Sequence, residues 1–164
     1  MVDKNLKSAN ILIVDDQETN IELLRELLSI EGCLNIKSTT DPRKVIGLVK
    51  SFQPDLMLLD LHMPFLSGFD IMELLKTEKI IDINSEKYLP ILVLTADVSP
   101  EIKLKALRAG AKDFLAKPFD MTEVSLRIKN LLETQYLYQK MGIQKAFFEA
   151  KIIEFLKFKD EWYR

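Results

Sequence analysis

Four short runs of apolar residues constrain the fold more than any other feature of the sequence. The runs are Ile11–Val14, Leu56–Leu59, Ile91–Leu94 and Phe114–Ala116. None alternates apolar with polar residues, so each is typical of a strand buried on both faces, as in a parallel sheet. Proline precedes the second and third runs and follows the fourth, which favours strands over buried helical segments. A weaker strand is predicted from Leu34 to Ser38.

Helical patterns separate the strands. Apolar residues recur at helical spacing before Gly32 and Gly110, and glycine commonly ends a helix. Asp41 and Ser99 each precede a proline, which predicts an N-cap followed by proline in the first turn. Asp120 begins a capping-box pattern. The order is therefore strand then helix, five times over, and it predicts an α/β fold with parallel strands and right-handed crossovers.

Two stretches depart from this five-unit layout. The polar residues 76–89 predict an extended loop after the third helix. The stretch from Met121 to Arg164 holds no proline and one glycine and predicts helix throughout. Its first apolar stripe suits packing on a sheet and comprises Val124, Ile128, Leu131 and Leu132. A second stripe comprises Leu137, Met141, Phe148, Ile152 and Phe155. We therefore expect an N-terminal tail over residues 1–8, a domain over 9–134 and a helical extension or linker over 135–164.

Composition excludes several classes of function. The chain has 164 residues, of which 23 are basic and 25 acidic, for a formal net charge of −2. This balance argues against direct nucleic-acid binding through a bulk positive surface. No apolar run is long enough to span a membrane. The single cysteine, Cys33, excludes a disulfide framework within one chain, and we expect a reduced, cytoplasmic location.

The residues at the predicted strand ends suggest a chemical site. Asp15 and Asp16 follow the first strand, Asp60 ends the third, Thr95 ends the fourth and Lys117 follows the fifth. Ligands of open α/β sheets bind outside the carboxyl ends of the strands, so these five side chains should converge. Three neighbouring carboxylates repel one another and call for a divalent cation, and all-oxygen ligands suit Mg²⁺.

In this arrangement the sequence resembles the receiver domain of two-component response regulators. The resemblance covers Ala9 to Leu132. The matching motifs are the acidic pair after Ile-Leu-Ile-Val, Asp60 within Leu-Leu-Asp-Leu-His-Met-Pro-Phe-Leu-Ser-Gly, Thr95-Ala96, and Lys117-Pro118-Phe119. Their order and their places at strand ends make the combination specific. The resemblance implies a flavodoxin-like, doubly wound five-stranded parallel sheet with strand order 2-1-3-4-5, followed here by the C-terminal helical extension.

The resemblance also implies a phosphoacceptor switch in a phosphorelay. Asp60 would take a phosphoryl group from a partner histidine kinase or phosphotransfer protein. Asp15, Asp16 and Asp60 would bind Mg²⁺ together with the backbone carbonyl of His62. The protein would then be no turnover enzyme, with at most self-phosphotransfer and slow autodephosphorylation.

Three further expectations follow from the resemblance. Lys117 would pair with Asp60 and then with a phosphoryl oxygen, and the Lys117-Pro118 peptide bond would be cis. Thr95 would bond another phosphoryl oxygen. Phe114 stands where the family places its switch aromatic and would turn inward as Thr95 moves. Singly, each of these residues has an ordinary structural explanation, and only their joint placement favours the function.

Two other classes of function compete with the switch. Mg²⁺-dependent phosphatases with an aspartyl-phosphate intermediate place an Asp-x-Asp nucleophile on the first strand, whereas here Asp15 and Asp16 are adjacent. A degenerate receiver acting only as a dimerising adaptor would have lost part of the site. The output is open: residues 126–137 resemble linkers to cyclic-di-nucleotide phosphodiesterase or cyclase domains, and the second apolar stripe predicts a homodimer to which the tail helices contribute.

Overall fold

The computed structural model describes residues 6–81 and 88–162, without the side chains of 158–162. A helical turn at residues 6–8 leads into the first strand, and its Leu6 is buried in the core. The predicted loop at 76–89 lies partly outside the described residues. The elements are β1 (Asn10–Val14), α2 (Glu18–Ile30), β2 (Asn35–Thr39), a 3₁₀ turn (Pro42–Lys44), α3 (Val45–Phe52), β3 (Leu56–Asp60), α4 (Gly68–Thr77), β4 (Ile91–Thr95), α5 (Pro100–Ala109), β5 (Asp113–Ala116) and α6 (Met121–Trp162).

The five strands form one parallel sheet in the order β2-β1-β3-β4-β5. All residues of β3 and β4 are buried, as the continuous apolar runs predict. The edge strand β2 is half exposed, which explains why its sequence signal is weaker. The predicted fold class and strand order are confirmed.

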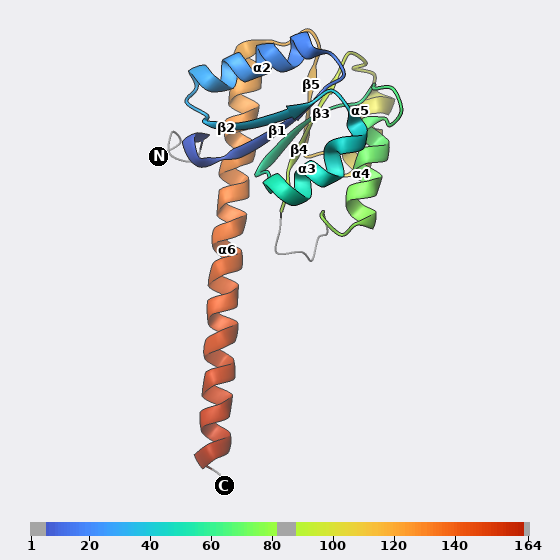
Figure 1. Ribbon diagram of the computed structural model, residues 1–164. Helices are drawn as coiled ribbons and strands as arrows, with labels where there is room; N and C mark the ends of the chain where they lie inside the picture. The colour runs from blue at the N-terminus through green and yellow to red at the C-terminus, as the bar shows by residue number, and fades with distance from the viewer. Residues whose placement is uncertain (1–5, 82–87, 163–164) are drawn as a thin grey trace.

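Helices cover both faces of the sheet (Figure 1). The apolar stripes of α2 and the first turns of α6 pack on one face, where Leu24 and Ile128 are buried against alternate residues of the strands. Helices α3, α4 and α5 pack on the other face around residues such as Val49 and Ile71. Strands β1, β3 and β4 thus contribute side chains to two cores, which is the physical reason that their sequences do not alternate apolar with polar residues.

Side-chain caps set several helix starts. The Ser99 and Asp120 side chains accept hydrogen bonds from the backbone at Ile102 and Glu123, as their sequence patterns predict. Asp41 caps the 3₁₀ turn that precedes α3, so the predicted helix start there is a short 3₁₀ segment. These caps orient the helices that begin beside the carboxyl edge of the sheet.

The last helix continues far beyond the sheet. Its 42 residues make it about 63 Å long, and its second half projects away from the domain as a rod (Figure 1). The predicted second stripe is exposed there: Met141, Phe148 and Phe155 are each about two-thirds accessible to solvent. Within the described residues, none of the helices combines the length and apolar character that crossing a membrane requires.

Candidate metal centre at the carboxyl edge of the sheet

The five predicted site residues lie at the carboxyl edge of the sheet. Asp15, Asp60 and Thr95 are buried, Asp16 is half-buried, and the Lys117 side chain is 18% exposed. Carboxylate oxygens of Asp15, Asp16 and Asp60 lie within 4.8 Å of one another. Parallel strands bring these residues together because their carboxyl ends share one edge.

Lys117 balances part of the negative charge. Its Nζ lies 3.3 Å from Asp60 Oδ1, as predicted, and 2.7 Å from Asp15 Oδ2, a closer contact that the sequence motifs did not indicate. The Lys117-Pro118 bond is cis, which confirms that prediction. Two buried carboxylates therefore share one ammonium group, and Asp15 makes the closer contact with it.

Asp15 is further held by the residues that begin α2. Its Oδ1 accepts a hydrogen bond from the backbone N–H of Gln17 at 2.9 Å, and the amide of Asn20 donates to both carboxylate oxygens at 3.2 Å. No sequence motif indicated Gln17 or Asn20 as site residues. An Asp side chain commonly accepts a hydrogen bond from the backbone N–H two residues further on, so an Asp just before a helix-forming segment is a signal for this contact.

Asp60 has fewer donors of its own. The backbone N–H of His62 donates to its Oδ1 at 3.3 Å. Burial raises the pKa of the Asp60 carboxyl to about 6, with the neighbouring Asp15 charge adding to the rise and Lys117 opposing it. Keeping Asp60 ionised in this partly desolvated site therefore costs free energy. A bound cation would lower that cost.

The two predicted switch residues have different surroundings. The Thr95 hydroxyl exchanges hydrogen bonds with the backbone of Asp97, at 3.0 and 3.2 Å. Phe114 is half-buried against the core under α5, and the Nζ of Lys103 lies 4.6 Å from its ring centroid. The His62 side chain is exposed at the rim. The role of its carbonyl as a metal ligand stays a prediction.

Gly68 is a site-supporting residue whose role the sequence did not reveal. It begins α4 and donates its N–H to the carbonyl of Leu61 at 3.0 Å. A Cβ at this position would lie 2.5 Å from the backbone oxygen of Asp60 and 3.0 Å from the Cα of Leu61. Only glycine allows α4 to approach the end of β3 this closely.

The donor set fits a hard divalent cation. It consists of carboxylate oxygens from three aspartates that converge on one point, and it carries more negative charge than Lys117 offsets. Oxygen-only sites of this kind suit Mg²⁺, which keeps several water ligands and needs few protein side chains.

Comparisons with known proteins agree with this geometry. Residues 11–129 match the family described as Response regulator receiver domain. The chain is 32% identical over 140 residues to the response regulator SaeR of Staphylococcus aureus; the match covers 85% of this chain but only 58% of that protein. The Vibrio cholerae chemotaxis protein CheY4 superimposes with a TM-score of 0.67 at 25% identity, over 75% of this chain and 98% of that one. The Francisella response regulator 1452 receiver domain has the same fold, with a TM-score of 0.68 at 24% identity, over 77% and 98%. The chain therefore belongs to the receiver-domain family of response regulators.

Proposed function

We propose that this chain is a phosphoacceptor switch in two-component signalling and that Asp60 receives the phosphoryl group. The observation that carries the proposal is the convergence of Asp15, Asp16 and Asp60 within 4.8 Å, with Lys117 bridging two of them. A buried carboxylate beside a fixed cation at the end of a central strand is suited to attack an activated phosphorus atom.

The donor in this proposal is a phosphohistidine on a partner histidine kinase or phosphotransfer protein. A carboxylate oxygen of Asp60 bonds to phosphorus while the nitrogen–phosphorus bond breaks and its electron pair returns to the histidine nitrogen. Mg²⁺, held by Asp15, Asp16, Asp60 and the His62 carbonyl, would offset the charge of the transferring group. After the transfer, the Lys117 ammonium group pairs with an oxygen of the phosphoryl group.

The switch step in this proposal begins at Thr95. Its hydroxyl leaves the Asp97 backbone, to which it is bonded here, and donates to a phosphoryl oxygen instead. The movement frees space into which the half-buried ring of Phe114 turns, and the surface over α5 and β5 changes. The chemistry is stoichiometric, and slow autodephosphorylation is the only turnover we propose.

The proposal extends to a cytoplasmic homodimer in which the extension pairs with its copy. Because the chain spans only 58% of the length of the curated relative, a further output domain belongs to the proposal as well. The linker-like sequence at residues 126–137 favours a cyclic-di-nucleotide output over direct nucleic-acid binding.

Incubation with acetyl phosphate and Mg²⁺ followed by intact-mass measurement tests the proposal. We expect wild-type protein to gain one phosphoryl group and Asp60→Asn to gain none. Asp120→Asn is the matched control, because asparagine preserves the N-cap oxygen of α6 while removing an acidic residue outside the site. It should gain the group as wild type does.

Two results would contradict this assignment. Equal mass gain in wild type and Asp60→Asn would show that a residue other than Asp60 accepts the phosphoryl group. Continuous release of phosphate over many turnovers would instead favour the Mg²⁺-dependent phosphatase class. Omitting Mg²⁺ or adding a chelator should abolish the mass gain, because the three carboxylates then repel the incoming phosphoryl group.

A further inference from the structure

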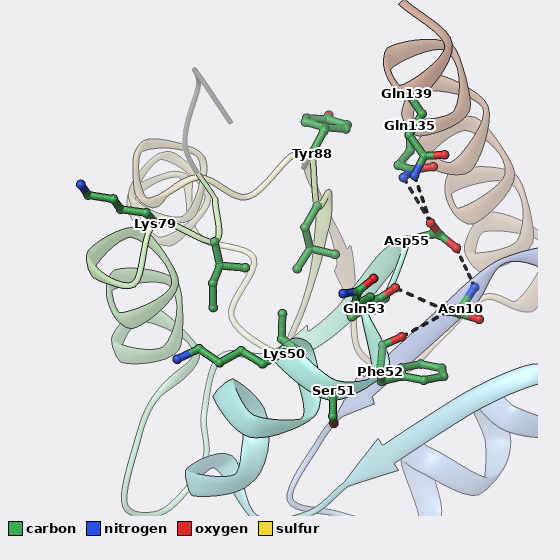
Figure 2. Close-up of a pocket in the computed structure, with 14 residues that line it drawn as sticks. Asn10, Lys50, Ser51, Phe52, Gln53, Asp55, Lys79, Tyr88, Gln135 and Gln139 are labelled. Carbon is green, nitrogen blue, oxygen red and sulfur yellow. Dashed lines mark hydrogen bonds between the residues drawn. The ribbon is translucent and has the colours of Figure 1, made fainter. Parts of the chain in front are cut away.

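A second cluster of polar contacts lies at the opposite, amino-terminal edge of the sheet. Asp55 immediately precedes β3, and its Oδ2 accepts a hydrogen bond from the backbone N–H of Asn10 at 2.8 Å. Its Oδ1 accepts from the side-chain amides of Gln135 and Gln139 on α6, at 3.3 and 3.4 Å. Figure 2 shows both glutamine amides pointing from the helix toward Asp55. One carboxylate thus joins the start of β1, the start of β3 and the last helix.

An aromatic contact beside Asp55 joins the same helix to β4. The rings of Tyr88 and Tyr138 lie with centroids 4.7 Å apart and planes tilted by 30°. Tyr88 lies three residues before Ile91, the first residue of β4. Aromatic rings packed at this distance attract each other beyond the apolar area that they bury. Together, Asp55, Tyr88, Gln135, Tyr138 and Gln139 form what we call the basal clamp.

The clamp sits on the two strands that also carry the site. Strand β3 runs from the residue after Asp55 to Asp60, and β4 runs from Ile91, three residues after Tyr88, to Thr95. Both strands are fully buried and five residues long, so a shift at one end reaches the other with little loss. The contacts of α6 at the clamp thus lie at the opposite ends of the two strands that carry Asp60 and Thr95.

The helix also has room to move at this point. A cavity of about 630 Å³ adjoins the clamp, and its lining includes Gln135, Gln139 and Lys50, which Figure 2 labels, as well as Val49 and Ile80. The clamp is also the last described contact between α6 and the sheet domain, since Met141 and the apolar residues beyond it are exposed.

We propose that the basal clamp sets the direction in which the rod of α6 leaves the domain, and that it passes shifts of β3 and β4 to the rod. Its five members are positioning residues, not catalytic ones. The second half of this proposal rests on the proposed function at Asp60; the first half does not.

Pulsed electron-spin distance measurements test both halves on the full chain. Spin labels on Glu22→Cys in α2 and Gln144→Cys in α6 report the direction of the rod, and the native Cys33 is buried. Labelled protein is diluted with unlabelled protein so that only distances within one chain count. Tyr138→Ala removes the ring contact, and Tyr136→Ala is the matched control, since it removes the same side chain from an exposed position two residues away.

Without a phosphodonor, we expect a narrow distance distribution in the parent and in Tyr136→Ala, and a wider or shifted one in Tyr138→Ala. Equal distance distributions in all three proteins would overturn the proposal that the clamp sets the direction of the rod. With acetyl phosphate and Mg²⁺, we expect a shift in the parent and in Tyr136→Ala that Tyr138→Ala lacks.

The intact mass of each sample separates the two proposals. A phosphorylated parent whose distance does not change overturns the transmission to the rod while leaving the function of Asp60 intact. If the parent protein gains no phosphoryl group, the proposed function is contradicted. The proposed transmission from Asp60 to the rod is then contradicted as well. In that case the distance distributions recorded without phosphodonor still test whether the basal clamp sets the direction of the rod.

Discussion

At the scale of single residues, the two buried aspartates of the site differ in how their charge is held. Asp15 receives hydrogen bonds from Gln17 and Asn20 and the shorter contact to Lys117. Asp60 receives one backbone hydrogen bond and the longer contact to Lys117. Burial therefore acts on Asp60 with less compensation, and its pKa rises to about 6.

This raised pKa predicts a stability change in Asp60→Asn. The carboxyl has an ordinary pKa of 3.8 in the unfolded chain and about 6 in the folded one, so the folded state binds more protons between these values. Stability then falls as pH rises through that window. In Mg²⁺-free buffer at neutral pH we expect Asp60→Asn to be more stable by roughly 1–3 kcal/mol, because asparagine carries no charge and Lys117 keeps Asp15. Urea unfolding measures the difference.

The advantage of Asp60→Asn should shrink as the pH is lowered toward about 4, where wild-type Asp60 is protonated when folded. Asp70→Asn is the control with the opposite sign. Hydrogen bonds from Ser67 lower the pKa of Asp70, so its carboxylate contributes stability at neutral pH that is lost as the pH falls through that lowered value. An Asp60→Asn protein less stable than wild type at neutral pH without metal would contradict the expected effect of burial.

At the scale of elements, the connection between β3 and α4 holds the Asp60 end of β3 in place. Ser67 and Asp70 form a capping box, with the Asp70 N–H donating to Ser67 Oγ at 3.1 Å and the Ser67 N–H donating to Asp70 Oδ2 at 2.8 Å. Gly68 lies between them and packs its bare Cα against the backbone of Asp60. The cap and the glycine together fix where α4 begins relative to the site.

Replacing Gly68 should disturb both stability and phosphorylation. Gly68→Ala forces a Cβ against the Asp60 carbonyl, and overpacking of this kind costs about 1–3 kcal/mol. We expect this loss in urea unfolding together with slower phosphorylation by acetyl phosphate, because the backbone of Asp60 must shift.

Gly47→Ala is the matched control for this prediction. Gly47 lies on the exposed side of α3, and a Cβ there meets no atom within 4 Å. Alanine should stabilise that helix by up to about 1 kcal/mol and leave the phosphorylation rate unchanged. A Gly68→Ala protein that matched Gly47→Ala in both measurements would show that α4 can retreat from β3 without cost.

At the scale of the whole molecule, the rod of α6 exposes a row of large apolar side chains. Met141, Phe148, Ile152 and Phe155 are each more than half exposed. Their spacings of seven, four and three residues fit the heptad repeat of a coiled-coil seam. Leu137 lies four residues before Met141, which puts it one position out of register with that repeat. Exposed apolar rows of this size mark contact surfaces, and a second copy of the helix presents a matching row.

We expect the full chain to sediment as a dimer at tens of micromolar and a chain cut after Gln135 to sediment as a monomer. Phe148→Glu should weaken the dimer, because it places a charge inside the seam. Phe147→Glu is the matched control: Phe147 is similarly exposed but lies about 100° around the helix from Phe148.

Two outcomes would count against a dimer through the rod. Full-length and truncated chains could both sediment as monomers, with or without the phosphoryl group. Alternatively, the truncated chain could remain a dimer, which would place the contact on the sheet domain instead of the extension.

The sequence by itself determined the sheet, its two-sided burial and the residues at its carboxyl edge. The reason is local: a strand buried on both faces must be apolar throughout, and the first polar residue after it, such as Asp15 or Lys117, falls at the ligand-binding edge. The helix caps at Ser99 and Asp120 could also be predicted from the sequence, because a cap forms hydrogen bonds between residues within one turn. The continuous helix after Met121 followed from the lack of helix breakers.

Tertiary structure decided what depends on distances between segments far apart in the chain. Lys117 lies closer to Asp15 than to Asp60, although both carboxylates precede it by more than 50 residues. The requirement for glycine at 68 arises from the backbone of Asp60, eight residues away across a turn. Asp55 meets Gln135 and Gln139 only because β3 and α6 pack side by side. Sequence periodicity specifies which face of an element is buried, but the particular atoms that meet across that face are set by how the elements pack.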